Sequence, residues 1–186
     1  HQNHLIALAK ILNTKNIPVK LHAFMDGRDT APSGGKEFLK DVIEHTSKLR
    51  NFSVATITGR YWAMDRDNNW DRIERAYVAI VDGEGVKSKE PISAIQASYD
   101  QGKTDEFMLP NVLSGYRGMD NGDAILMFNF RSDRARQIIS CFVDPEFYEF
   151  KKKRNINLTA QVTMTEYSAH ISQFTEVLFP KRKLDK

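Results

Sequence analysis

Arginine and aspartate residues follow directly after hydrophobic segments at several places in this sequence. In 124-AILMFNFRSDRARQ-137, an apolar run that predicts a buried strand leads without a break into three arginines and one aspartate. Removing a guanidinium from water is costly unless an anion pairs with it. One aspartate cannot pair with three arginines. The stretch therefore predicts a binding site for an anion that comes from outside the segment.

Two other segments, 26-DGRD-29 and 60-RYWAMDRD-67, show the same pattern, because each follows a predicted strand. In sheets with parallel strands, the loops after the carboxyl ends of the strands lie at one edge, where ligands bind. If the three strands are parallel, the charged side chains converge on that edge. The residues expected there are Arg28, Asp29, Arg60, Arg66, Arg131 and Arg134.

Arginine suits an anion site because its planar fork meets two oxygens of a carboxylate or phosphate at once and stays charged. Arg131 and Arg134 are three residues apart, so together they could hold one small dianion. Ser132 is predicted to cap a helix over 133–142, whose first N–H groups would also attract an anion.

Other interpretations of these charges stay open from the sequence. The segments 131-RSDR-134 and 65-DRD-67 could form internal ion pairs at loop ends and need no ligand. The aspartates could bind a divalent cation through their oxygens, but the arginines among them should repel it. No metal site is therefore predicted, and His1, His4 and His22 are interpreted as ordinary histidines.

The hydrophobic pattern predicts helices and strands in alternation. Helices are expected over 3–14, 38–49, 70–82, 91–101 and 133–142, and strands over 18–24, 53–59, 106–113, 124–130 and 158–167. This order predicts an α/β fold with three layers, αβα, around a mostly parallel mixed sheet. One domain is expected over residues 1–180, followed by a loosely ordered, solvated tail over 181–186.

Composition restricts the class of protein further. The chain has 186 residues, of which 41% are hydrophobic and 27% charged, and its net charge is +3, which permits anionic ligands without indicating nucleic acid. Its apolar runs are far shorter than the ~20 residues of a membrane helix. Cys141 is the single cysteine and is interpreted as a buried thiol, which fits a cytoplasmic protein. The run 151-KKKR-154 lacks interleaved aromatic residues and is interpreted as a solvated loop.

Three longer segments resemble the cofactor-independent phosphoglycerate mutase family: 22-HAFMDGRDT-30, 58-TGRYWAMDRDNNWDRIERAY-77 and 122-GDAILMFNFRSDRARQI-138. The similarity covers nearly the whole chain, in the family's order. It implies the inserted domain that holds the glycerate while 3-phosphoglycerate and 2-phosphoglycerate are interconverted in glycolysis and gluconeogenesis. The family's other domain is phosphatase-like, with a serine nucleophile and two metal ions, usually manganese and otherwise magnesium. Nothing in this chain resembles that domain.

The resemblance implies a role for each residue of the predicted site. It assigns substrate binding to Arg28, Asp29, Arg60, Arg66, Arg131 and Arg134. Asp29 matches the aspartate expected to bind the glycerate hydroxyls and to help move a proton. The family's Asp-Gly-Gly-Val-His-Ser-His stretch binds substrate through its first histidine, and His1 matches the second one. Ser132 and Thr58 stand where the family often has proline and serine.

The resulting interpretation is a substrate-binding domain that is inactive alone and works with a phosphatase-like catalytic domain. It uses no cofactor of its own, while the catalytic domain would carry the two manganese or magnesium ions. The expected partners are phosphoglycerate and that domain, without nucleic acid or membrane. One alternative is a stand-alone module for phosphorylated metabolites. A third, less favoured, is an RNA-binding domain that uses 151-KKKR-154 and 181-KRK-183.

Overall fold

The computed structural model describes residues 2–180. Its helices are α1 (Gln2–Thr14), α2 (Gly35–Thr46), α3 (Arg60–Ala63), α4 (Trp70–Val81), α5 (Pro91–Asp100) and α6 (Arg136–Val143), with the short 3₁₀ turns η1 (Asp105–Phe107) and η2 (Ile171–Gln173). Its strands are β1 (Val19–Met25), β2 (Phe52–Gly59), β3 (Val86–Ser88), β4 (Asn111–Leu113), β5 (Ala124–Met127), β6 (Ala160–Thr163) and β7 (Glu176–Val177). His1 and the predicted tail over 181–186 lie outside the described residues.

A four-stranded mixed sheet has the order β1-β2-β4-β3. β1 and β2 are parallel, with Val19 opposite Phe52 and Met25 opposite Gly59, so both strands end at the same edge. β4 is antiparallel to β2 and parallel to β3. The parallel pair places the loop after β1 beside the start of α3, as the sequence predicts for two of the three charged segments.

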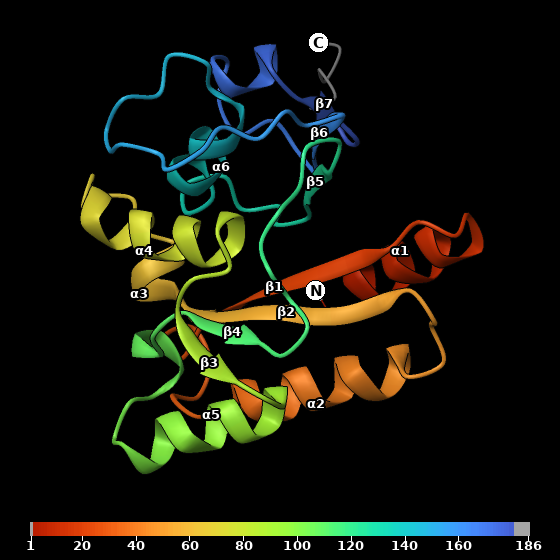
Figure 1. The fold of residues 1–186 in the computed structure, drawn as a ribbon, viewed down its shortest axis with the longest axis vertical. Coiled ribbons are helices and arrows are strands. Elements are labelled where there is room, and N and C mark those ends of the chain that lie inside the picture. The colour runs from red at the N-terminus through yellow and green to blue at the C-terminus, as the bar shows by residue number, and fades with distance from the viewer. Residues whose placement is uncertain (1, 181–186) are drawn as a thin grey trace, which may run out of the picture.

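Helices cover both faces of this sheet, which confirms the predicted α/β class (Figure 1). On one face, α2 and α5 pack against apolar residues of β1, β2 and β4, around the fully buried Ile57 and Ile95. On the other face, a second core joins α3, α4 and α6 and contacts Phe24 of β1. α1 contacts β1 and α2, and Gln2 donates a hydrogen bond to Asp41 of α2 at 2.5 Å. None of the helices described is both long and apolar enough to cross a membrane.

The predicted strand over 124–130 does not join this sheet. Its structured part, β5, pairs in parallel with β6, and β6 with β7, in a separate three-stranded sheet. α6 packs against this second sheet through Ile139 and neighbouring apolar side chains. Between β4 and β5, three glycines with positive φ redirect the chain, namely Gly115, Gly118 and Gly122. Alternation within a strand shows which side chains share a face, but it does not show which strand is the neighbour.

Some predicted boundaries were wrong for local reasons. Only residues 111–113 of the predicted strand over 106–113 form a strand, because η1 and Pro110 occupy its first part. Ser132 is not the N-cap of α6, which begins at Arg136 after Ala135. The Ser132 carbonyl instead accepts the N–H groups of Ala135 and Arg136 in a turn that precedes the helix.

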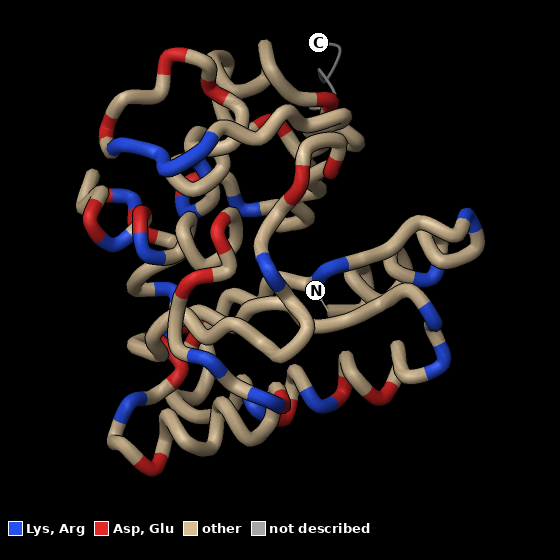
Figure 2. The backbone as a smooth tube through the Cα atoms, in the orientation of Figure 1, with Lys and Arg blue, Asp and Glu red and all other residues tan. Residues whose placement is uncertain are grey.

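The basic run 151–154 lies on the loop between α6 and β6 and forms a continuous stretch of positive residues (Figure 2). Three of its four side chains have partners within the chain. Lys153 pairs with Glu84, and Arg154 pairs with Asp82 at 3.0 Å. The Lys152 ammonium lies 4.9 Å from the centre of the Phe147 ring. Three of the four residues are exposed, in agreement with the predicted solvated loop, and the charges of Lys153 and Arg154 also attach the loop to the end of α4.

Candidate functional site

The loop after β1 is shaped by its own aspartate. Gly27 has φ +72, and a Cβ there would approach the backbone nitrogen of Glu106 to 2.9 Å, so the turn requires glycine. The Asp26 carboxylate accepts the N–H groups of Arg28 and Asp29, each at 3.2 Å. This turn directs both side chains that the sequence assigns to the site toward the edge formed by β1 and β2.

Arg60 stands directly after β2, and its side chain is only 5% exposed. Gly59 before it has to be small, because a Cβ there would overlap the carbonyl groups of Asp105 and Glu106. The Arg60 guanidinium donates to Asp26 and, at 3.0 Å, to Asp29. Burial opposes ionisation of Asp26, but hydrogen bonds from Arg60 and from the turn outweigh it and hold the pKa of Asp26 below its ordinary value.

The segment after β5 brings a second group of charges to the same place. Asp133 accepts from Arg131 at 3.0 Å and from Arg66 at 2.8 Å. These two guanidiniums lower the pKa of Asp133, against the opposing effect of burial. Arg131 also lies 3.6 Å from Asp29, so an ion pair connects the loop after β1 with the segment after β5. The six predicted residues therefore converge, although their strands belong to two sheets.

Arg134 is in a different electrostatic situation from its neighbours. It donates to the Met64 carbonyl at 3.3 Å, and none of the carboxylates described forms an ion pair with it. Burial and the charges of Arg60, Arg66 and Arg28 lower the pKa of Arg134, and Asp133 offsets only part of this effect. The Nε atoms of Arg134 and Arg60 are buried without an acceptor. Such buried unsatisfied donors are costly, and both atoms are closed to solvent in this structure.

Both sequence interpretations of the charges find support in these contacts. Arg66 and Arg131 form internal ion pairs through Asp133, as the ligand-free alternative requires. Arg28 has only a long contact of 3.8 Å with Glu106. Among the described residues, five arginines thus meet the four carboxylates of Asp26, Asp29, Asp133 and Glu106, which leaves one positive charge in excess. The site can accept an anion.

Sequence reasoning omitted Asp26 and Asp133 from the predicted site. The signal for both was present, since each aspartate lies within two residues of a selected arginine. No cluster of three or more histidine, cysteine, aspartate or glutamate side chains able to hold a metal ion occurs within residues 2–180. His22 instead shares a hydrogen bond of 2.9 Å with Thr56 of the neighbouring strand.

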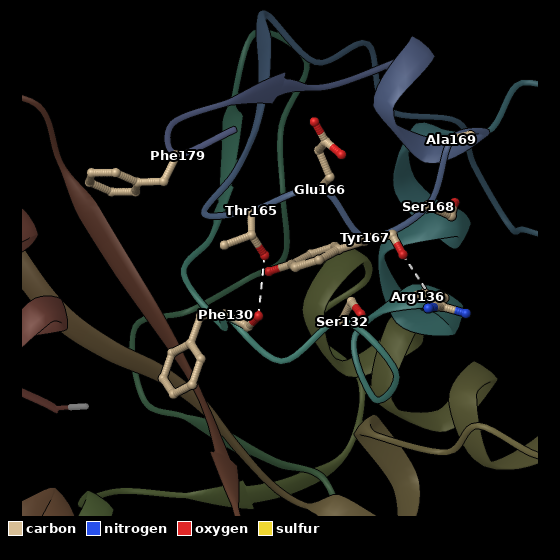
Figure 3. A pocket seen from close by; sticks show the side chains of 9 residues that line it. All are labelled: Phe130, Ser132, Arg136, Thr165, Glu166, Tyr167, Ser168, Ala169 and Phe179. Carbon is tan, nitrogen blue, oxygen red and sulfur yellow. Dashed lines mark hydrogen bonds between the residues drawn. The ribbon is translucent and has the colours of Figure 1, made fainter. Parts of the chain in front are cut away.

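A cavity of about 480 Å³ lies beside the charged site, on the β5–β7 half of the molecule (Figure 3). Its wall includes Phe130 and Ser132, which flank Arg131, together with Thr165, Arg136 and Phe179. Arg136 donates to the Tyr167 carbonyl at 2.8 Å, and Thr165 donates to the Phe130 carbonyl at 3.2 Å. None of the six predicted residues lines this cavity, so it borders the anion site but is separate from it.

The fold and the geometry together define a class: an α/β domain with a cluster of arginines and aspartates at the ends of its strands. Residues 1–169 match the family model described as the BPG-independent PGAM N-terminus. The chain belongs to this family, the N-terminal region of 2,3-bisphosphoglycerate-independent phosphoglycerate mutases. The predicted resemblance is thereby confirmed.

Individual relatives agree with this assignment. The chain is 44% identical over 185 residues to a 2,3-bisphosphoglycerate-independent phosphoglycerate mutase of Gluconobacter oxydans, a match that covers 100% of this chain and 36% of the relative. The enzyme of the same name from Clostridium perfringens is 46% identical over 173 residues, which are 90% of this chain and 33% of the relative. The chain therefore spans about a third of the length of these curated relatives.

A solved structure shows the same fold. The phosphoglycerate mutase of Leishmania mexicana, crystallised at low cobalt concentration, superimposes with a TM-score of 0.87 at 25% sequence identity. The match covers 98% of this chain and 36% of that one. The two-sheet arrangement thus corresponds to one part of a larger enzyme.

Proposed function

We propose that this chain binds and orients the glycerate part of 2- and 3-phosphoglycerate for the phosphoglycerate mutase reaction of glycolysis and gluconeogenesis. The observation that carries the proposal is Arg134, a partly buried guanidinium surrounded by other arginines, which forms no ion pair with any described carboxylate. An anionic ligand that meets the exposed part of this guanidinium would supply the countercharge. Relatives that are named as phosphoglycerate mutases support this choice of anion.

The arrangement of charges suits a ligand with two anionic groups and hydroxyls between them. Arg28 and Arg60 come from one half of the molecule and Arg131 and Arg134 from the other, so a carboxylate and a phosphate can each meet guanidinium groups. Asp29 is 58% exposed and lies between Arg60 and Arg131. There it can accept hydrogen bonds from glycerate hydroxyls, orient them and help to move a proton once a catalytic domain is present.

The chemistry of phosphoryl transfer is assigned to another part of the enzyme. Within residues 2–180 no metal-binding cluster is present, so the described residues do not fit the two manganese or magnesium ions of the family. In the proposal, a phosphatase-like domain holds these ions and the serine nucleophile. Residues 1–180 form the substrate-binding domain, act in the cytoplasm, and have no mutase activity alone.

Titration with 3-phosphoglycerate tests the proposal. We expect the amide resonances of Arg28, Arg60 and Arg131 to shift, with a dissociation constant of about 1 mM, because each charge-assisted contact contributes about 1.5–3 kcal/mol and an open site loses part of it to ligand ordering. Arg134→Ala and Arg131→Ala should each weaken binding about tenfold.

Arg50→Ala is the matched control, because the exposed Arg50 precedes β2 at the opposite end of that strand. It should leave the dissociation constant unchanged. Shifts confined to residues 151–154, with none at Arg28, Arg60 and Arg131, would show that the proposed site is wrong.

A further inference from the structure

Asp65 lies next to Arg66 in the connection between α3 and α4, but its carboxylate faces the protein interior. Its side chain is only 4% exposed. Oδ2 accepts the backbone N–H groups of Asp67 at 2.9 Å and Asn69 at 3.0 Å. Oδ1 accepts from the Asn69 side-chain amide at 2.9 Å and from Arg72 at 3.3 Å. One carboxylate therefore closes the turn on which Arg66 is carried.

The same turn is attached to α6, which follows the Arg131–Arg134 segment. The side-chain amide of Gln137, on α6, is oriented with its nitrogen toward Asp65 and its oxygen toward Asn68. In this orientation the nitrogen donates to Asp65 Oδ2 at 2.9 Å and to the Asp65 carbonyl at 2.8 Å. The amide oxygen then accepts the Asn68 N–H at 2.9 Å. Asn68 has φ +61, a left-handed conformation that the surrounding contacts hold in place. The turn thus has a fixed position relative to the second half of the site.

The ion-pair partner of Asp65 is itself packed against an aromatic ring. Arg72, its ion-pair partner, lies 4.0 Å from the centre of the Tyr61 ring on α3. Burial works against the charged carboxylate, but the hydrogen bonds from Asn69 and Asp67 and the charge of Arg72 outweigh it, so the pKa of Asp65 is lowered. The carboxylate is therefore ionised at neutral pH and keeps its full set of acceptor sites.

We propose that Asp65 is a positioning residue for ligand binding, which acts through Arg66 by fixing the 65–69 turn against α6. The inference rests on the proposed function, and it places at that ligand Arg66, which the resemblance described above assigns to substrate binding. Asp65 itself does not contact the ligand, because its carboxylate is enclosed by the turn. Asp133 holds the Arg66 guanidinium at 2.8 Å, but it can do so only when the turn presents Arg66 toward it.

The sign of one measurement separates positioning from simple electrostatics. Asp65→Asn removes a negative charge near an anion site, and by charge alone this change would strengthen the binding of 3-phosphoglycerate. If Asp65 positions Arg66, binding weakens instead, because an amide cannot accept from all the donors that the carboxylate satisfies. We expect the dissociation constant for 3-phosphoglycerate, measured by calorimetry on the 186-residue chain, to rise about fivefold, within the range of measured coupling energies.

A double-mutant cycle with Arg66→Ala tests the route of the effect. When Arg66 is absent, Asp65→Asn should change the dissociation constant less than about 1.5-fold. An equal loss in both backgrounds would overturn the proposal, because Asp65 would then act without Arg66. Unchanged or tighter binding in the Asp65→Asn single variant would overturn it too.

Two further variants keep the test decisive. Asn69→Ala removes one donor to Asp65 and keeps the carboxylate, so it should weaken binding in the same direction by a smaller factor, even if Asp65→Asn fails to fold. Asp144→Asn is the matched control, because Asp144 also accepts a backbone N–H, from Glu146 at 2.9 Å, but lies at the other end of α6. It should leave binding unchanged. If Arg131→Ala has no effect on binding, the proposed function itself fails, and the two failures are thereby distinguished.

Discussion

At the scale of the residue, the arginines of the site differ in burial and in partners, although each follows a predicted strand in the sequence. Arg60 is buried and held by two aspartates, whereas Arg131 is 62% exposed and held at the surface. A buried guanidinium with fixed partners needs no further ordering when a ligand arrives. Arg60 therefore shapes the site as well as contributing charge to it.

Replacement of Arg60 should affect stability as well as binding. Arg60→Ala leaves Asp26 and Asp29 without their shared partner, and we expect the free energy of unfolding to fall by about 2 kcal/mol, less than for a fully buried pair because both carboxylates keep contact with water. Urea unfolding followed by the fluorescence of Trp62 and Trp70 measures this. Arg50→Ala provides the comparison, and equal midpoints for the two variants would contradict the role given to Arg60.

His22 should give the stability of the chain a pH dependence. Burial lowers its pKa from 6.5 to about 4. Between these values the unfolded chain binds a proton that the folded chain does not, so stability is complete above pH 6.5 and falls as the pH decreases. We expect a loss of about 1–2 kcal/mol between pH 6.5 and pH 5, which His22→Gln removes. A parallel decline in both proteins, measured by urea unfolding across this range, would assign the effect to other groups.

At the scale of the element, the sequence predicts most of what surrounds the site. Strands β1 and β2 and the loops that follow them were predictable, because a hydrophobic strand followed by Asp-Gly or Gly-Arg indicates both the strand and its end. Their parallel pairing agrees with the mostly parallel sheet that the alternation of helices and strands favours. The separate pairing of β5 was not predictable, because alternation does not identify a neighbouring strand. The inward-facing carboxylate of Asp65 was also hidden, since Asp65 and Asp67 look equivalent in the sequence.

The end of β2 provides a test of how closely this edge is packed. In Gly59→Ala, the new Cβ would overlap the backbone of Asp105 and Glu106, although φ at this position is an ordinary −66°. We expect a loss of about 1–3 kcal/mol in the free energy of unfolding, measured in urea, and weaker binding of 3-phosphoglycerate because Arg60 follows directly. Gly34→Ala is the control, since its Cβ would meet neighbours at 3.4 Å, an ordinary contact. Equal stability of the two variants would contradict the close contact between residue 59 and the backbone of Asp105 and Glu106.

At the scale of the whole molecule, the site lies where the two sheets meet. Asp29 follows β1 of the first sheet, Arg131 follows β5 of the second, and the pair is 3.6 Å apart. The helices α4 and α6 share one core that joins the two halves. A ligand bound by arginines from both halves would connect them. Only the folded chain brings these arginines together, so the ligand would bind the folded state and not the unfolded one.

Binding should therefore stabilise the entire chain. With a dissociation constant of about 1 mM, 10 mM 3-phosphoglycerate should contribute about 1.4 kcal/mol, which raises the Tm of a chain of this size by about 3–5 °C. Differential scanning calorimetry measures the shift. Sodium acetate at the same ionic strength is the control and should give less than about 1 °C, because it presents only one carboxylate. Equal shifts with both salts would indicate a general effect of ions.

The glycine-containing connection over 114–123 has a consequence for how the sequence can vary over time. This segment joins β4 of one sheet to β5 of the other, so its length sets where Arg131 can stand relative to Asp29. Insertions are usually tolerated in surface loops, and the connection between α2 and β2, over 47–51, begins and ends within one half. Across related genes, we therefore expect insertions and deletions to be more frequent over 47–51 than over 114–123, even though no residue of either segment belongs to the proposed site.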